Sequence, residues 1–319
     1  MAPDGPAATD AALHDALARG ALGHYGHAEA HLKLLRRGDN AVYRVTGDRG
    51  RFVLRLHTSG RHGGRALTSE LAWLDHLSRA ADLPVPHPVR ATSGAWAVQT
   101  GGAETPPVWC SLLSWVEGES LAEDGGLTAP QAFQAGELLA RLHLEAGRFV
   151  VPQDFERPRY SLEHFRTCWH GLTQSLTGQV PGGRLAGLRS RLERVSAPLR
   201  EMEDLPGGYG LIHADPHPGN FLQREAGLGL LDFDRCGWGP FLLDIAHTSL
   251  DLEESVREAL FSGYRGVRAL PAGAEAPLRA LRILAAVENL AFLARRPHER
   301  PFVLEALPFI ERAASKLDA

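Results

Sequence analysis

The hydrophobic and polar positions divide the chain into an N-terminal part with strand-like patterns and a longer C-terminal part with helical patterns. Thr9 and Asp10 are suitable helix caps, and the amphipathic segment after them reaches about Leu22. Short apolar runs between polar turns predict strands near residues 31–36, 40–46 and 51–57. We therefore expect a helix followed by a small antiparallel sheet.

A second helix is predicted from Leu67 to Ala80, and its apolar face contains one acid. At 100° per residue the leucines form a single stripe, and Glu70 falls inside it, between Leu74 and Leu77. A carboxylate that points into a core needs a partner. The alternative is that Glu70 lies at the solvent edge of an imperfect stripe.

Beyond the predicted sheet the periodicity becomes that of helices. An apolar run at residues 108–116 is strand-like and breaks at Glu117. Helical patterns then dominate, at residues 130–145, 162–172 and 185–202, and again after Asp244. A small sheet with a larger, mostly helical part is an α+β organisation.

One stretch of the helical part carries polar residues at fixed offsets. His213-Ala214-Asp215 is followed by Asn220, and an apolar run at residues 228–231 then ends in Asp232-Phe233-Asp234. Two prolines and a glycine brace the loop between Asp215 and Asn220. The apolar run predicts a buried strand that delivers Asp232 at its end.

Phosphoryl transfer uses these residue types. One carboxylate accepts or orients the attacking hydroxyl, while an amide oxygen and a second carboxylate hold the metal that bridges the nucleotide phosphates. Asp215, Asn220 and Asp232 fit these three roles in that order. A lone His-x-Asp is more often an ordinary hydrogen-bonded turn, but its combination with Asn220 and a strand ending at Asp232 favours a kinase.

These residues resemble the aminoglycoside phosphotransferase and choline kinase superfamily. The segments that match are His213 to Asn220, Asp232 to Asp234, Gly237 to Asp244, Gly38 to Val45, Val53 to Leu56, Glu70 and Ser114 to Gly118. Ala214 stands where many members have glycine. The resemblance implies a protein-kinase-like fold of two lobes, which we place at residues 1–116 for the nucleotide and 117–319 for catalysis and the acceptor.

The resemblance also implies nucleotide-binding residues in the first lobe. In kinase-like folds a basic residue of the third strand contacts phosphates and pairs with an acid of the next helix, which here implies Arg55 and Glu70. Backbone groups of Ser114, Trp115 and Val116 would meet adenine.

The bend at Gly38-Asp39-Asn40 is a candidate phosphate cradle, with Asn40 as its nucleotide-binding residue. An ordinary hairpin turn explains the same sequence about equally well.

Arg55 departs from the protein kinases, which have lysine at this position. Lys33 and Lys316 are the lysines of the chain, so no neighbouring lysine takes the role, although Lys33 is a conceivable substitute from across the sheet. Arginine keeps the charge and can bridge phosphate oxygens with two parallel bonds. We favour an active enzyme, and a nucleotide-binding pseudokinase is the competing hypothesis.

Two further acids lie near the motif. In relatives the residue at Asp244 braces the catalytic loop, and a plain helix N-terminal carboxylate is an equally simple interpretation. Asp234 could reach the metal or the acceptor, or could simply turn the loop after Asp232.

The acceptor pocket gives the weakest signal. Glu288 lies in an almost wholly apolar helix and could hold a cationic or polyhydroxylated acceptor, although neutralisation by Arg282 or Arg295 is the simpler interpretation. His217 and Trp238 flank the motif and could line the same cleft or be packing residues.

The composition limits the class of protein to which this chain can belong. The chain is 44% hydrophobic and 23% charged, which is typical of a globular protein, and a net charge of −4 gives no electrostatic footprint for nucleic acid. Its three separated cysteines suggest neither a disulfide framework nor a zinc site. No apolar run approaches membrane-spanning length and the first residues do not resemble a signal peptide, so we expect a cytoplasmic location without membrane partners.

The sequence therefore predicts a phosphotransferase that uses Mg²⁺ and ATP, with GTP as the other candidate donor, to phosphorylate a hydroxyl of a small molecule. Aminoglycosides, amino alcohols, homoserine-like compounds and amino sugars are the candidate acceptors. A protein Ser/Thr kinase of the bacterial stress-response type is the alternative enzyme.

Overall fold

The computed structural model describes residues 6–38, 40–58, 63–80, 83–102, 105–121, 126–202 and 207–317. The chain divides into two compact units, Met1–Glu117 with Val150–Arg157, and Gly118–Phe149 with Pro158–Ala319. Asp39 of the predicted phosphate bend and the first five residues, considered above for a signal peptide, lie outside the described residues. Each unit is described by itself below.

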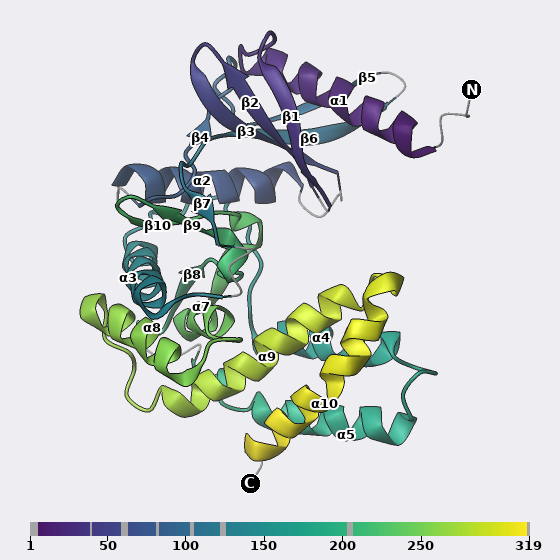
Figure 1. Cartoon of the computed structure of the whole chain (residues 1–319), viewed down its shortest axis with the longest axis vertical. Helices are drawn as coiled ribbons and strands as arrows, with labels where there is room; N and C mark the ends of the chain where they lie inside the picture. The colour runs from purple at the N-terminus through teal and green to yellow at the C-terminus, as the bar shows by residue number, and fades with distance from the viewer. Residues whose placement is uncertain are drawn as a thin grey trace. The chain divides into compact units, whose positions relative to one another are not determined.

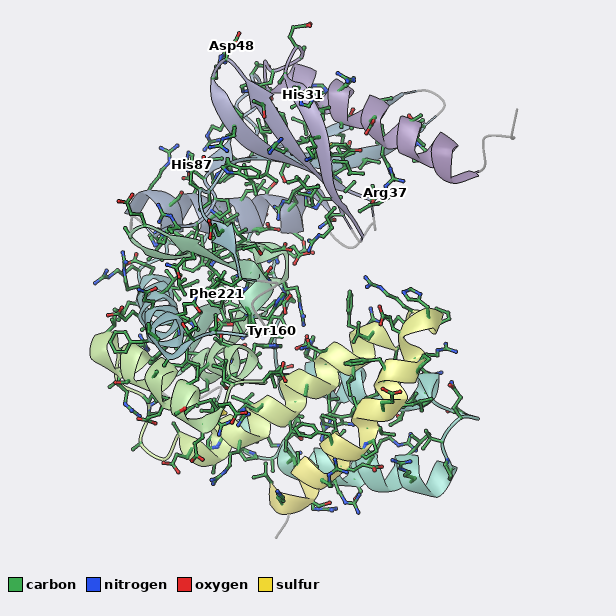
Figure 2. The ribbon with its side chains drawn as sticks, viewed as in Figure 1. His31, Arg37, Asp48, His87, Tyr160 and Phe221 are labelled. Carbon is green, nitrogen blue, oxygen red and sulfur yellow. The ribbon has the colours of Figure 1, made fainter. Side chains whose placement is uncertain are left out.

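The first unit is an antiparallel sheet with two helices (Figure 1). Its elements are α1 (Pro6–His24), β1 (His31–Arg37), β2 (Ala41–Gly47), β3 (Gly50–His57), α2 (Gly64–Ala80), β4 (Pro88–Val89), β5 (Ala97–Gly102) and β6 (Thr105–Ser114). The strand order is β1-β2-β3-β6-β4, with β5 also paired to β6. Figure 2 labels His31 and Arg37 at the two ends of β1, where both are exposed.

The three predicted strands are confirmed to within a residue or two, whereas the start of the first helix is wrong. The helix begins at Pro6, so Thr9 and Asp10 lie inside it and do not cap it. Proline suits the first helical position because its missing N–H has no partner there in any case.

The core of the first unit lies between α1 and the sheet (Figure 1). Leu22 of α1 and Tyr25, just after this helix, are buried in one cluster with Val45, Leu54 and Leu56 of the strands. The Tyr25 hydroxyl donates to the carbonyl of Trp96 at 2.7 Å, which satisfies the polar end of a buried ring. Apolar burial of this kind supplies most of the stability of such a sheet.

Helix α2 follows the predicted pattern. Leu67, Leu71, Leu74 and Leu77 are buried, and Glu70 is completely buried among them. The interpretation that Glu70 lies at the solvent edge is therefore wrong.

The second unit is mostly helical, as predicted (Figure 1). Its helices are α3 (Ala129–Ala146), α4 (Leu162–Ser175), α5 (Gly182–Val195), α6 (Leu199–Met202), α7 (Phe241–Thr248), α8 (Glu254–Val267), α9 (Glu275–Leu293) and α10 (Arg300–Leu317). In the part of the chain that the structure describes, no helix combines the length and apolar character needed to cross a membrane.

The single helix predicted at residues 185–202 is wrong, because two helices occupy this region. Helix α5 ends at Val195 and α6 begins at Leu199. Pro198 lies between them, and proline inside a helix removes a hydrogen bond and clashes with the preceding turn.

Two small sheets of the second unit position the polar motif. One has the order β10-β9-β7, from Gly227–Leu230, Phe221–Arg224 and Glu119–Ser120, and the other pairs β11 (Gly237–Pro240) with β8 (Tyr209–Ile212). Strand β8 leads directly into His213, and β10 ends shortly before Asp232. Phe221 is fully buried in this region, where Figure 2 shows it among packed side chains.

Helices α3 and α8 approach closely because each presents a glycine at their contact. A Cβ added to Gly136 would collide with the carbonyl oxygen of Leu260, and one added to Gly263 would collide with that of Phe133. Backbone atoms cannot move aside as a flexible side chain can, so this contact requires glycine on both helices.

We predict that Gly263→Ala lowers the free energy of unfolding by about 1–3 kcal/mol, because the methyl group forces α3 and α8 apart. Gly266→Ala in the same helix is the matched control, since a Cβ at Gly266 meets nothing within 4 Å. It should stabilise the protein by up to about 1 kcal/mol through helix propensity. Denaturant unfolding of both variants checks this, and equal effects would contradict the packing argument.

Candidate functional site

The loop that follows β8 is held by a single buried carboxylate. Asp244, in the first turn of α7, accepts the backbone N–H of His213 at 2.8 Å and that of Ala214 at 2.7 Å. The side chain is fully buried. The two bonds show that Asp244 fixes the loop backbone directly, beyond being an acid near a helix N-terminus.

The segments that follow β8 and β10 each contain one residue with a strained backbone. Ala214 has φ 65° and Asp232 has φ 62°, and no other non-glycine residue in the described part of the chain has positive φ. This region costs an L-residue about 1–2 kcal/mol, so surrounding interactions must enforce it. At Ala214 the hydrogen bond to Asp244 is one such interaction.

His213 connects the loop to the segment before Asp232. Its Nδ1 accepts the N–H of Asp215 at 3.2 Å, and its Nε2 donates to the carbonyl of Leu231 at 2.8 Å. Only a neutral imidazole with its proton on Nε2 can make both bonds. Burial lowers the pKa of His213, in agreement with this neutral form.

Asn220 completes the connection among the three motif residues. Its side-chain nitrogen donates to the carbonyl of Asp215 at 2.9 Å, and its own carbonyl accepts the N–H of Leu231 at 2.8 Å. The amide nitrogen is used in this way, so Oδ1 is the atom that can face a cation. The structure thus brings Asp215, Asn220 and the start of the Asp232 turn into one hydrogen-bonded network.

His143 of α3 supports Asp244 from behind. Its Nε2 lies 3.0 Å from Asp244 Oδ2 and its Nδ1 lies 2.9 Å from the Tyr264 hydroxyl, with the ring fully buried. Burial lowers the pKa of His143, although Asp244 acts in the opposite direction. Burial alone would raise the pKa of Asp244, but the hydrogen bonds from His143 and the His213 N–H lower it. The pair is therefore a neutral imidazole donating to a carboxylate.

A second charged network touches Asp215. Arg235 lies just after the Asp232-Phe233-Asp234 turn, with Nη1 3.3 Å from Asp215 Oδ1, and its Nη2 donates to Glu288 Oε1. Burial acts to raise the pKa of Glu288, but the Arg235 guanidinium and His164 hold it well below its usual value. Glu288 is thus neutralised by an arginine, but this is Arg235 and not the predicted Arg282 or Arg295.

The same buried acid also receives a histidine. His164 of α4 places Nε2 2.9 Å from Glu288 Oε1. Cys168, one turn further along α4, has its sulfur 3.6 Å from that nitrogen. His247 of α7 has Nε2 3.6 Å from Glu288 Oε2. Two helices, α4 and α7, therefore bring side chains to Glu288 of α9.

The first unit contains its own buried ion pair. Arg55 of β3 donates through Nη2 to Glu70 Oε1 at 2.5 Å, and its Nε reaches the Ser111 hydroxyl at 3.4 Å. The second carboxylate oxygen of Glu70 lies 3.9 Å from Nη1 of Arg157. Lys33 is exposed on β1, so Arg55 and not Lys33 pairs with the acid of α2.

The segment predicted to meet adenine has part of its backbone already in use. The backbone N–H of Ser114 donates to the carbonyl of His87 at 2.8 Å, and that of Trp115 donates to the carbonyl of Arg51 at 3.2 Å. Asn40 is buried immediately before β2.

The remaining predicted residues lie around the motif in the second unit. His217 is exposed, and its Nδ1 accepts the N–H of Gly219 at 3.1 Å, so it caps the short helical turn Pro218–Asn220. Trp238 is half-buried on β11, where its backbone N–H donates to the carbonyl of Pro158. Asp234 is half-buried within the turn that follows Asp232.

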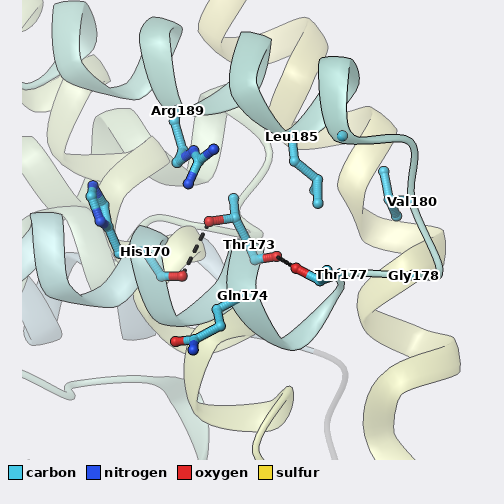
Figure 3. Close-up of a pocket in the computed structure, with 9 residues that line it drawn as sticks. His170, Thr173, Gln174, Thr177, Gly178, Val180, Leu185 and Arg189 are labelled. Carbon is cyan, nitrogen blue, oxygen red and sulfur yellow. Dashed lines mark hydrogen bonds between the residues drawn. The ribbon is translucent and has the colours of Figure 1, made fainter.

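A separate pocket lies between α4 and α5 (Figure 3). His170, Thr173 and Arg189 contribute to its lining, and Figure 3 shows the Thr173 hydroxyl bonded to the carbonyl of His170. The residues that line it include none of the predicted site residues. The pocket therefore belongs to the helical bundle and not to the motif.

Residues of these networks that no sequence pattern marks include His143, Arg157, His164, Arg235 and His247. Each meets its partner from a distant part of the chain, as with His143 and Asp244. No local pattern marks them. The one available signal is that a buried acid such as Glu70 or Glu288 requires a cation or a donor from somewhere.

Comparison with known proteins identifies the family. The model of the phosphotransferase enzyme family matches residues 31–281, and the chain belongs to this family. It is thus a phosphotransferase (kinase) that acts on an alcohol group of a small molecule, and the predicted two-part α+β kinase-like fold and superfamily are confirmed.

Three relatives illustrate the similarity. The structure of a microcompartment-associated aminopropanol kinase is 28% identical, covers 95% of this chain and 96% of its own, and has a TM-score of 0.80. A homoserine kinase of Neisseria meningitidis serogroup B is 32% identical over 46% of this chain and 47% of its own. The amicoumacin kinase hAmiN, in complex with AMP-PNP, Ca²⁺ and Ami, is 19% identical over 96% of this chain and 93% of its own, with a TM-score of 0.73, and shares the fold.

We predict that Asp244→Ala lowers the free energy of unfolding by about 3–5 kcal/mol, because it leaves two buried backbone N–H groups and His143 without their acceptor. Asp244→Asn should cost less, since the amide keeps one oxygen. Asp251 is exposed, and Asp251→Ala should change stability by less than about 0.5 kcal/mol. Denaturant unfolding measures all three, and similar values for Asp244→Ala and Asp251→Ala would contradict the bracing role.

The buried neutral histidines His143 and His213 predict that the folded protein loses stability at acidic pH. Burial lowers the pKa of both His143 and His213 below 6.5, so below about pH 6.5 the unfolded chain binds protons that the folded protein excludes. Stability should therefore fall as the pH is lowered from 6.5, by at most about 1.4 kcal/mol per pH unit for each histidine. Unfolding of the protein and of His143→Gln at several pH values checks this, because the variant should show a shallower slope; parallel slopes would rule out His143 as a source.

Proposed function

We propose that this protein transfers the γ-phosphoryl group of ATP to a hydroxyl of a small molecule, with the motif of the second unit as its catalytic centre. The observation that carries the proposal is the network in which His213 and Asn220 connect Asp215 to the turn at Asp232. Phosphoryl transfer depends mainly on positioning and electrostatics, so a rigidly fixed set of these residue types is what it requires.

In this proposal Asp215 orients the acceptor hydroxyl and takes its proton. The backbone of Asp215 is fixed on both sides, by the bond from its N–H to His213 and by the bond from Asn220 to its carbonyl. Its side chain is partly exposed, so a hydroxyl can approach it. A carboxylate with an immobile backbone contributes through a defined direction of attack.

Asn220 and Asp232 would hold Mg²⁺. Their oxygens are ligands that suit this ion, and the amide nitrogen of Asn220 is already bound elsewhere, which selects Oδ1. A bound magnesium ion neutralises charge on the nucleotide phosphates. The strained backbone of Asp232 supports a functional position, since such strain concentrates at active sites.

The first unit would bind the nucleotide. Glu70 holds Arg55 in one orientation, and with Arg157 nearby two guanidinium groups face this one acid, which suits contact between Arg55 and phosphate oxygens. Of the three residues predicted at the adenine edge, Ser114 and Trp115 use their N–H groups internally, so we assign the N–H contact to Val116. Asn40 would lie at the phosphates.

The names of related proteins suggest where to look for the acceptor. An aminopropanol kinase and a homoserine kinase are among the relatives, and both names denote a compound with an amine and a hydroxyl group. Amino alcohols, hydroxy amino acids, aminoglycosides and amino sugars therefore form the first panel of acceptors.

We predict ATP consumption with at least one acceptor of this panel in the presence of Mg²⁺, and a loss of at least about 10²-fold in kcat for Asp215→Ala. A coupled ADP assay measures turnover, with Asp251→Ala as the control variant. Removing Mg²⁺ with a chelator should abolish the activity, and adding the ion back should restore it.

Two outcomes would contradict the proposal. Nucleotide binding without turnover on any acceptor favours a pseudokinase, and turnover confined to a protein substrate favours a protein kinase. Turnover that persists unchanged in Asp215→Ala would show that the reaction uses a different centre.

A further inference from the structure

Asp215, Arg235, Glu288 and His164 form a chain of charge contacts, which bears on the kind of acceptor the site can bind. Arg235 contacts both Asp215, at 3.3 Å, and Glu288, while His164 contacts Glu288 at 2.9 Å. Tyr160 fixes the backbone of Arg235, because its hydroxyl donates to the Arg235 carbonyl at 2.5 Å. Arg235 and His164 thus share the Glu288 carboxylate, and Arg235 also contacts Asp215, the proposed catalytic base.

Burial separates the two signs of charge. The Glu288 side chain is 7% exposed, whereas those of Arg235 and His164 are 21% and 27% exposed. Asp215 has a similar exposure, 22%. Glu288 is therefore the buried member of this network. The side chains of Arg235 and His164 are about as accessible to solvent as that of Asp215.

His164 carries its charge at neutral pH. Burial opposes the imidazolium, but the hydrogen bonds with Cys168 and Glu288 outweigh it and raise the pKa of His164 to about 9. The guanidinium of Arg235 is always protonated. Two cations, Arg235 and His164, therefore surround the buried Glu288 carboxylate, and Arg235 also contacts the partly exposed carboxylate of Asp215.

We propose that Arg235 and His164 bind an anionic group of the acceptor, and that the acceptor is a hydroxycarboxylic acid, with or without an amino group. Its hydroxyl would lie at Asp215 and its carboxylate at Arg235 and His164. This inference rests on the proposed role of Asp215. An arginine fork with a second donor beside it is the side-chain arrangement that carboxylates favour.

Glu288 is then a positioning residue that acts through Arg235 and His164. Its Oε1 already receives both cations, and its Oε2 is buried beside His247. A cationic acceptor would have to displace Arg235 or His164 to reach this acid. The sequence-based hypothesis that Glu288 itself holds a cationic acceptor is therefore not the one we propose.

A metal ion is the competing occupant of the same cluster. One ligand atom from each of His164, Cys168 and Glu288 lies within 4.8 Å of the others. The Arg235 guanidinium, however, bonds to the same Glu288 oxygen as His164, and a cation there would meet its positive charge. The arrangement favours an anion outside the cluster over a metal inside it.

The test compares hydroxy acids with their neutral carboxamides, such as homoserine with homoserine amide and 4-hydroxybutyrate with 4-hydroxybutyramide. We expect kcat/KM to be higher for the acid of a pair by roughly tenfold or more, because the amide lacks the charge that Arg235 and His164 recognise. Arg235→Gln and His164→Gln should each reduce this preference, mainly through KM, and Arg235→Lys should retain part of it. Arg295→Gln, an exposed arginine of the same unit, is the matched control and should keep the preference.

A second variant separates the loss of acceptor binding from a loss of stability caused by an unpaired buried charge. Arg235→Gln leaves Glu288 with one cation fewer, so a double variant that adds Glu288→Gln removes one charge of each sign. It should fold, as circular dichroism and thermal unfolding would show, and should still lack the preference for the acid. A merely structural role of Arg235 would leave the ratio of acid to amide unchanged in the folded double variant.

Different failures have different meanings. If an amino alcohol or a neutral amide is used as well as the best hydroxy acid, the inference is overturned while the proposed function stands. The same holds if the ratio survives in both Arg235→Gln and His164→Gln. If no acceptor of any kind is phosphorylated, the proposed function fails and this inference falls with it.

Discussion

The buried carboxylate of Asp244 is the constraint on which the rest of the second unit's site depends. It binds the backbone of His213 and Ala214 and is itself held by His143 of α3, so α3, α7 and the loop after β8 meet at one charge. An ionised acid is stable there because every partner is a donor. The same bonds offset the energetic cost of the left-handed backbone at Ala214. The next residue is Asp215, whose N–H and carbonyl are both hydrogen-bonded.

Each unit repeats one electrostatic device, a buried acid that holds cations in place. In the first unit Glu70 has Arg55 and Arg157 around it, and in the second Glu288 has Arg235 and His164. A long basic side chain loses conformational freedom when it is anchored, so less entropy remains to be lost when it binds an anion. Pre-organised cations suit an enzyme whose donor, and on our inference whose acceptor, carries negative charge.

Chain connectivity explains why these groups work together. The motif from His213 to Asp234 is continuous in sequence, yet its residues reach one another through bonds between two different small sheets. The bond from His213, after β8, to the carbonyl of Leu231, after β10, is one of them. Rigid elements on both sides leave few ways for the loop to rearrange. The glycine contact between α3 and α8 is part of this scaffold, because α3 also supplies His143.

The sequence by itself determined the elements that depend on near neighbours. Strand patterns, the buried stripe of α2 and the offsets of Asp215, Asn220 and Asp232 are local, because periodicity and turn chemistry are set by residues close along the chain. The helical position of Glu70 also favoured its burial, and the structure decided between the core and the solvent edge. The break between α5 and α6 falls at Pro198, which the apolar periodicity of residues 185–202 does not reveal.

Only the tertiary structure decided which distant side chain satisfies each buried charge. Glu288 could have met Arg282 or Arg295, its neighbours on the same helix and just beyond, but it meets Arg235 and His164 from a turn and another helix. Glu70 likewise gains Arg157 from a segment far along the chain. A buried charge demands a partner without specifying which one, and that choice depends on how helices and loops pack in three dimensions.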